Sequence, residues 1–438
     1  MKKKVLILLG LILIFSCNLE KDKNIGVTVI TKWQKNKKSA ISITYDDGII
    51  NQFTVAKPIM DSFQLPGTFY ILTGKINGAE KGKFIGRKKE EIIEETKKIK
   101  TNKENFFERA SLIAYTGTTE AIDYHSRIGS LYEAGKTLEA YKLLDEGYRK
   151  IRNGNIKNLN IEILHDNTVD TTTWEDLNIY AKEGHEIASH TVTHPRLAVL
   201  DEKNLLYELE QSKKDIENFL GKKYTFSAEC PYGTEDERVM SYAHKIYPSL
   251  RNRMEVPYLD ELNRSSNKHP GESENDYVQW QRGPLTNTKL SEMKGWVDTC
   301  LDNDNIWLVL VFHGIDGIGW EPKTGKELED YFKYIKEREE QIWVATFSDV
   351  TKYIRERENT IIESEMKGKS IKIHISNNLE ASVYDIPITL KTYIPKNWKS
   401  ISINKDKIIF DVKTDKKGNY ITYSVLPSES SLILEEVI

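Results

Sequence analysis

Short apolar runs alternate with amphipathic segments from about residue 38 to residue 358. Residues 41–45 and 67–73 predict the first two strands, and residues 186–188, 224–228, 306–312 and 342–346 predict further strands. Between them, residues 173–183, 201–220, 288–302 and 326–340 place apolar side chains at helical spacing, and a last helix is expected to end near residue 358. At least six strand–helix units in this order predict a parallel α/β sheet or barrel over residues 38–360.

Two segments depart from this alternation. Residues 75–165 have a mostly helical pattern, with helices expected at 90–100, 105–115, 119–133 and 137–152, and we interpret them as an insertion in one barrel loop. After Lys367 the pattern changes to the alternation of β-strands, at 371–375, 388–390 and 408–410. Residues 368–438 are therefore expected to form a separate small all-β sandwich.

The N-terminus has the features of an export signal. Three lysines precede an apolar run over residues 5–15, which is too short for a membrane helix of ~20 residues. The run ends in Ile14-Phe15-Ser16-Cys17, which resembles a bacterial lipoprotein cleavage box. We expect a signal peptide at 1–16, an acylated Cys17, a tether at 17–37, and an exported protein that is lipid-anchored to a bacterial membrane. The alternative is an ordinary signal peptide with an incidental cysteine.

Composition narrows the function classes. The 438 residues include 63 basic and 66 acidic side chains, for a net charge of -3, and no basic stripe stands out. This balance argues against a nucleic-acid partner. Three cysteines are too few for a disulfide framework, and Cys230 and Cys300 are expected to be packing residues.

Polar side chains follow the predicted strands at the points where the strands end. They are Asp46 and Asp47, His190 and His194, Pro231-Tyr232-Gly233, and His313. In a βα barrel these ends share one rim, where active sites form, so the groups are expected to meet in space.

The residue types at this rim indicate a metal site. A carboxylate with two imidazoles is a familiar ligand set for catalytic Zn²⁺ or a similar divalent ion. His190 and His194 are four residues apart, so one turn or tight loop can direct both rings to one ion. The adjacent aspartates point in different directions, so one can bind metal while the other acts on a water molecule.

These residues together resemble the motifs of a known family. Four segments resemble, in order, the signature motifs of the polysaccharide deacetylases. They are Thr44-Tyr45-Asp46-Asp47-Gly48, the run from His190 to Pro195, Pro231-Tyr232-Gly233, and Leu310-Val311-Phe312-His313. The likeness covers about residues 38–75 and 166–357. It implies a metal-dependent carbohydrate esterase on a distorted (β/α)₇ barrel, here with a helical insertion and a C-terminal β module.

The resemblance also implies a role for each motif residue. Asp46 would be the catalytic base, His313 the acid, and the backbone N–H of Tyr232 a donor to the oxyanion. Asp47, His190 and His194 would hold one divalent ion, with Zn²⁺ favoured and Co²⁺ or Mn²⁺ as alternatives.

One position departs from the family pattern. Members usually carry an arginine two residues before the proline of the third motif, where it orients the base, and this chain has Glu229 there. The candidates to replace it are Arg251 and Arg253, which follow an apparent strand at 247–250, and Arg282, which follows a strand-like segment at 277–280. Arg251 is favoured because it stands nearest the end of such a strand. Trp320, after a glycine-rich stretch, is a candidate for binding sugar.

The expected activity is removal of N- or O-acetyl groups from sugars of an extracellular glycan or oligosaccharide. The substituted arginine position keeps open a glycan-binding lipoprotein on a catalytically impaired scaffold. A metal phosphodiesterase is a weaker alternative, because the sequence offers no Arg or Lys clamp for a phosphoryl group.

Overall fold

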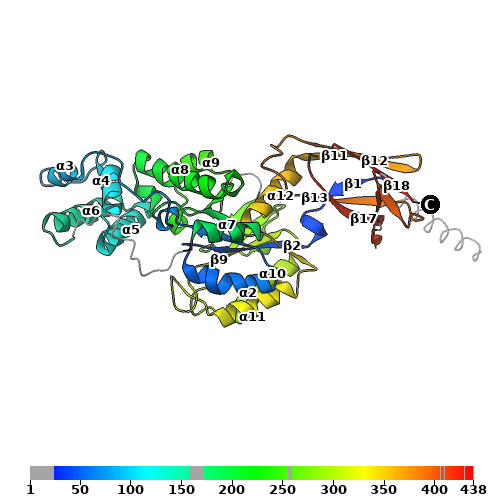
Figure 1. The fold of residues 1–438 in the computed structure, drawn as a ribbon, viewed down its shortest axis with the longest axis horizontal. Helices are drawn as coiled ribbons and strands as arrows, with labels where there is room; N and C mark the ends of the chain where they lie inside the picture. Colours follow the sequence, from blue (N-terminus) through cyan, green and yellow to red (C-terminus); the bar gives the residue numbers. More distant parts are fainter. Residues whose placement is uncertain are drawn as a thin grey trace, which may run out of the picture.

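The computed structural model describes residues 24–156, 172–254, 259–404, 406–408, 410–428 and 430–437 (Figure 1). The predicted signal peptide at 1–16 and Cys17 lie outside the described residues. Within the described ranges, no helix combines the length and the apolar character needed to cross a bilayer.

A nine-stranded parallel sheet forms the centre of the molecule. Its strands are β2 (Ser39–Tyr45), β3 (Gly67–Ile71), β4 (Glu186–Ser189), β5 (Ser227–Ala228), β6 (Ser249–Leu250), β7 (Asp260–Leu262), β8 (Val278–Arg282), β9 (Ile306–Phe312) and β10 (Ile342–Val344). They pair in the order β6-β5-β4-β3-β2-β9-β8-β7, and β10 pairs with the start of β2. Among the described residues no pairing joins β6 to β7, so the sheet is an incompletely closed barrel. The expected distorted α/β barrel is confirmed.

Helices pack on the outside of this sheet. They are α2 (Lys57–Ser62), α7 (Trp174–Lys182), α8 (Glu202–Phe219), α9 (Glu237–Ile246), α10 (Leu290–Asp302), α11 (Gly325–Lys336) and α12 (Phe347–Asn359). Alternation along β2 explains the two faces, because Ile41, Ile43 and Tyr45 pack in the apolar core with helix residues. Ser42 and Thr44 point the other way, where Ser42 accepts a hydrogen bond from the Trp307 indole (3.0 Å). The polar side chains of β2 thus lead along its second face up to the rim at Asp46.

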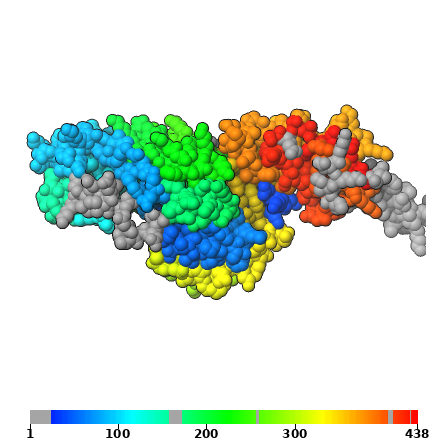
Figure 2. Space-filling model, in the orientation of Figure 1, coloured from blue at the N-terminus to red at the C-terminus, as the bar shows by residue number. Residues whose placement is uncertain are grey.

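Four helices form the insertion between β3 and β4, as the sequence predicts, although the first ends at Glu95 and not near residue 100. They are α3 (Lys89–Glu95), α4 (Phe106–Ala114), α5 (Thr119–Glu133) and α6 (Thr137–Arg152). They enclose an apolar cluster of their own that includes Phe106, Ile128 and Leu144. Figures 1 and 2 show the insertion at one end of the molecule and the C-terminal β region at the other.

The C-terminal region consists of two antiparallel sheets. One contains β1 (Thr28–Ile30), β13 (Ile388–Ile394), β17 (Gly418–Val425) and β16 (Lys413–Asp415). The other contains β11 (Thr360–Lys367), β12 (Ser370–Asn377), β18 (Ser431–Glu436), β14 (Ile401–Ile403) and β15 (Asp406–Ile408). Apolar side chains of both sheets, such as Ile373 and Leu390, belong to one buried cluster.

Two expected boundaries are corrected here. The predicted tether at 17–37 is wrong from residue 24 onward, because β1 pairs with β13 and Trp33 is fully buried beside Tyr277. The β region also begins at Thr360, eight residues before the predicted start, because α12 leads directly into β11. The N-terminal segment therefore contributes an edge strand to the first of the two C-terminal sheets, where β1 pairs with β13.

Candidate active site

Asp46 follows β2 and is held by an arginine from a neighbouring strand end. Arg251 Nη1 lies 2.7 Å from Asp46 Oδ1, and Arg251 Nη2 lies 2.6 Å from Asp46 Oδ2. Arg251 also donates to Thr44 Oγ1 at 2.7 Å, which fixes the guanidinium to the barrel interior. Burial alone would raise the pKa of Asp46, but Arg251 and His313 outweigh it and hold this pKa below its usual range. Asp46 is therefore an ionised, oriented carboxylate.

Glu229 occupies the position where the family resemblance implies an arginine. Its Oε1 lies 2.9 Å from Arg251 Nη2, so the guanidinium stands between two buried carboxylates. Burial, with a contribution from the Asp46 charge, raises the pKa of Glu229 to about 7 although Arg251 opposes this. Glu229 thus contacts the same guanidinium that binds Asp46. Of the three arginine candidates, Arg251 is the one that contacts Asp46.

The other two candidates have different partners. Arg253 pairs with Glu237 at 2.6 Å and donates to the carbonyl oxygen of Glu235. Arg282 lies over the Trp280 ring, with 4.9 Å from its guanidinium carbon to the ring centroid.

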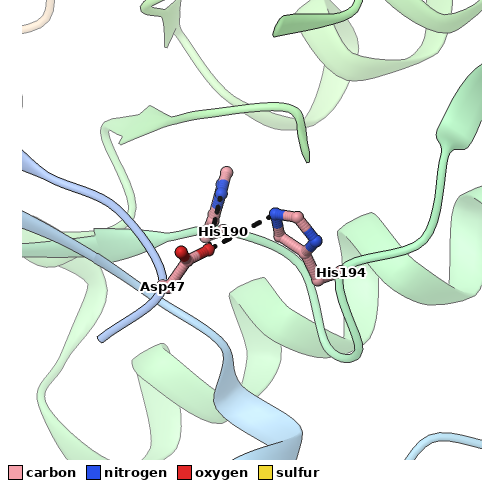
Figure 3. Close-up of side chains that lie close together, drawn as sticks. All are labelled: Asp47, His190 and His194. Atoms are coloured by element: carbon pink, nitrogen blue, oxygen red, sulfur yellow. Dashed lines mark ion pairs between the residues drawn. The ribbon is translucent and has the colours of Figure 1, made fainter. Parts of the chain in front are cut away.

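Asp47, His190 and His194 converge at the same rim (Figure 3). Asp47 Oδ1 lies 3.7 Å from His190 Nε2 and 3.4 Å from His194 Nε2. One ligand atom from each side chain can be chosen so that all three lie within 4.8 Å of one another. Burial lowers the pKa of His190 to about 4 and that of His194 to about 3, so both rings are neutral near pH 7, as metal ligands must be.

Backbone and outer contacts orient these three side chains. The Nδ1 of His190 is 2.9 Å from the carbonyl oxygen of Glu229, which leaves Nε2 as the atom directed at Asp47. Asp47 and His194 have φ of 77° and 66°, in the left-handed region that non-glycine residues rarely adopt. Such strain persists only where the surroundings fix the conformation. The oriented neutral imidazoles, with one carboxylate, fit a divalent ion.

A buried carboxylate that carries no motif holds the loop between the two histidines. Glu208 of α8 accepts hydrogen bonds from the backbone N–H groups of Val192 (2.8 Å) and Thr193 (2.9 Å) through Oε2. Its Oε1 accepts from Thr193 Oγ1 and from the Tyr115 hydroxyl, both at 2.7 Å. Tyr115 follows α4, so this carboxylate also links the insertion to the loop. Sequence reasoning missed Glu208, because an acidic residue inside an amphipathic helix usually faces solvent.

His313 follows β9, and its Nε2 lies 3.4 Å from Asp46 Oδ2. Burial lowers the pKa of His313, and the Asp46 charge opposes this by favouring the protonated ring. The Gln52 side chain joins the two loops by donating to the carbonyl oxygens of Asp46 (2.5 Å) and His313 (2.9 Å). Gln52 was also missed, since it is the sixth residue after Asp46 and has no distinguishing pattern.

Tyr232 and Trp320 line the rim. Tyr232 lies in a short turn over Pro231–Gly233 with φ of 63°, and its ring centroid is 4.7 Å from that of His194. The Trp320 ring centroid is 4.7 Å from that of His313. Cys230 and Cys300 are buried free cysteines, in agreement with a packing role.

Helix α5 of the insertion contacts the loop that follows His194. The backbone N–H of Arg196 donates to His125 Nε2 at 2.9 Å, and the Arg196 side chain pairs with Glu133. Glu133 also accepts a hydrogen bond from Thr234, in the turn after Tyr232. The insertion therefore supports two of the loops that form the rim.

Comparison with known proteins agrees with these motifs. The sequence model of the polysaccharide deacetylase family matches residues 153–247, a range that contains His190, His194 and Tyr232. A gellan lyase from a Bacillus species is 25% identical over 290 residues, which cover 60% of this chain and 11% of that protein. The match thus spans about a tenth of that relative's length.

Solved structures of deacetylases are also similar. A polysaccharide deacetylase from Mycobacterium smegmatis is 12% identical with a TM-score of 0.37, covering 75% of this chain and 94% of that one. A peptidoglycan deacetylase from Bacillus subtilis is 14% identical with a TM-score of 0.31, covering 74% and 94%. A family 4 carbohydrate esterase from Bacillus anthracis is 15% identical with a TM-score of 0.31, covering 76% and 91%. Residues 153–247 of this chain thus match the polysaccharide deacetylase family.

Proposed function

We propose that this protein is a metal-dependent hydrolase that removes N- or O-linked acetyl groups from sugars of an extracellular glycan or oligosaccharide. One observation carries the proposal: the ionised Asp46, fixed by Arg251, lies 3.4 Å from His313 and beside the group of Asp47, His190 and His194. A carboxylate base, an imidazole acid and a set of divalent-metal ligands are the parts that hydrolysis of an acyl group needs.

Each side chain has a defined task in this proposal. Asp46 accepts the proton of the attacking water, because Arg251 keeps the carboxylate ionised and directs its oxygens. The backbone N–H of Tyr232 donates to the oxygen that gains charge as the acetyl carbonyl is attacked. His313 gives a proton to the leaving amine or alcohol; burial lowers its pKa, and the neighbouring Asp46 charge opposes this by favouring the protonated ring. A divalent cation held by Asp47, His190 and His194 would supply Lewis-acid chemistry, with Zn²⁺ favoured and Co²⁺ or Mn²⁺ as alternatives.

The second candidate is a glycan-binding lipoprotein on an impaired deacetylase scaffold. The reason to consider it is Glu229, which stands where the family resemblance implies an arginine. The contact of Arg251 with both Asp46 and Glu229 supports the enzyme instead, because the base retains a bidentate donor.

Free acetate released from a panel of glycans tests the proposal. The panel covers acetylated chitin, peptidoglycan and xylan oligosaccharides, and other plant and algal glycans. It also includes acetylated gellan, because the related Bacillus protein is a gellan lyase. We expect release from at least one glycan, its loss with chelator, and its return with Zn²⁺, Co²⁺ or Mn²⁺. Glycan binding without acetate release from any of them would instead support the binding protein.

A further inference from the structure

An exposed aromatic ring stands directly beside His313. Trp320 is 51% exposed, yet its ring makes an edge contact with the His313 ring, at a centroid distance of 4.7 Å and an interplanar angle of 74°. A large exposed aromatic side chain at this place offers a flat surface to the part of a substrate that lies next to His313.

The loop that carries Trp320 is fixed by hydrogen bonds on both sides of the ring. The backbone N–H of Gly314 donates to the Trp320 carbonyl at 2.9 Å, and the N–H of Lys323 donates to the Gly314 carbonyl at 3.1 Å. The Glu321 carboxylate accepts from the N–H (2.6 Å) and the hydroxyl (2.7 Å) of Thr286. The indole is thus exposed on an ordered loop, which lowers the entropic cost of binding against it.

A cation without an acidic partner lies over this ring. The Arg264 guanidinium carbon is 5.7 Å from the Trp320 ring centroid. Across the described ranges, Arg264 has no carboxylate within ion-pair distance, whereas Arg251 pairs with Asp46 and Arg196 pairs with Glu133. Arg264 is exposed, and its positive charge adds to the effect of burial, which lowers the pKa of His313.

We propose that Trp320 and Arg264 form a subsite for a uronic-acid residue next to the acetylated sugar, so that the substrate is an acidic glycan. The sugar ring packs against the exposed indole beside the Arg264 guanidinium, and its carboxylate accepts hydrogen bonds from that guanidinium, whose planar fork matches a carboxylate. This inference rests on the proposed deacetylase function, since it names the substrate class of the same site.

Binding to the turnover-impaired variant Asp46→Asn tests the subsite without requiring hydrolysis. The probes are acetylated oligosaccharides containing galacturonate or glucuronate, each compared with its methyl ester, which keeps the size and removes the charge. We expect at least one free acid to bind about tenfold or more tightly than its ester. Adding Arg264→Met should abolish that preference, while Trp320→Ala should weaken both forms about tenfold. Lys326→Met, which removes an exposed cation of α11 that pairs with Asp330, should keep the preference.

Two results would overturn the subsite: equal affinity for acid and ester in every pair, or a preference that survives Arg264→Met. Wild-type protein on the same probes separates this inference from the proposed function. Acid-selective binding without acetate release contradicts the deacetylase and leaves the subsite standing. Acetate release at equal rates from acids and esters supports the deacetylase and removes the subsite.

Discussion

Arg251 donates hydrogen bonds from both of its terminal nitrogens to the two carboxylate oxygens of Asp46, at 2.7 and 2.6 Å, although the two residues are 205 positions apart in the sequence. Arg251 follows β6 and Asp46 follows β2, so the pair forms across the barrel interior. Glu229 touches the same guanidinium from the strand end between them, at 2.9 Å. The arginine that binds Asp46 thus follows a later strand, and Glu229 occupies the position where the family resemblance implies an arginine.

Replacing Arg251 by Met should lower turnover about tenfold or more at unchanged metal content, because the base loses its orientation while the metal ligands keep theirs. It should also destabilise the fold by about 3–5 kcal/mol, since Asp46 and Glu229 become unpaired buried carboxylates. Arg251→Lys keeps a charge without the bidentate geometry, so it should lose activity with less loss of stability. Acetate release, elemental analysis and thermal unfolding check these outcomes. Arg253→Met is the matched control, and an equal effect there would count against the specific role of Arg251.

Glu208 should control metal affinity although it contacts no metal ligand directly. Glu208→Ala removes the acceptor for the N–H groups of Val192 and Thr193, so the loop between the histidines loses its anchor. We expect metal affinity to fall about 10- to 100-fold, as for other outer partners of metal ligands. Titration with Zn²⁺ measures this, and Tyr115→Phe should give a smaller effect. Glu210→Ala, an exposed acid on the same helix, should bind metal normally; unchanged affinity in Glu208→Ala would refute the anchoring role.

His125 should make stability depend on pH. Its Nδ1 donates to the Ala110 carbonyl and its Nε2 accepts the Arg196 N–H, so the buried ring is neutral, and burial lowers its pKa from 6.5 to about 4. Because the unfolded chain takes up this proton first, the contribution is complete above pH 6.5 and is lost as pH falls toward 4. We expect up to about 3 kcal/mol of loss in this window relative to His125→Gln, which does not titrate. Denaturant unfolding of both proteins across this window checks it, and parallel stability curves would refute it.

Cys17 should carry a lipid. The cleavage box at residues 14–17 predicts that labelled fatty acid enters the wild-type protein in bacterial cells and that Cys17→Ser becomes soluble without label. Cys230→Ser, at a buried position, serves as the labelled control. If Cys17→Ser carried as much label as the wild type, the predicted lipid anchor on Cys17 would be wrong, but the prediction of export would be unaffected.

The sequence predicts the strands and the rim residues well, because apolar runs and the polar residues that end them are local features. Residues 306–312 predict β9 with its full length, and Asp46, His190 and His313 stand at strand ends in the structure. Placement near a strand end was enough to favour Arg251 over Arg282.

Contacts between distant segments could not be predicted in the same way. β1 is three residues long and pairs with β13, more than 350 residues later, so nothing near it in the sequence indicates a strand. Glu208 and Gln52 act through hydrogen bonds to backbone groups of other loops, and such bonds leave no periodic pattern. Arg264 has no motif either, and its position over Trp320 depends on how two loops meet.

Acetate release by Asp46→Asn and His313→Ala, measured together with the metal content of each protein, tests whether these two residues move protons in the reaction. Asp46 and His313 are assigned to move protons and not to hold the ion, so both variants should keep the metal. Each should lose about 10²- to 10⁴-fold in turnover, the usual range for a general acid or base. Asp47→Ala, by contrast, should lose both metal and activity, because it removes one of the three converging ligands. Near-normal acetate release by both Asp46→Asn and His313→Ala would contradict their assignment as base and acid.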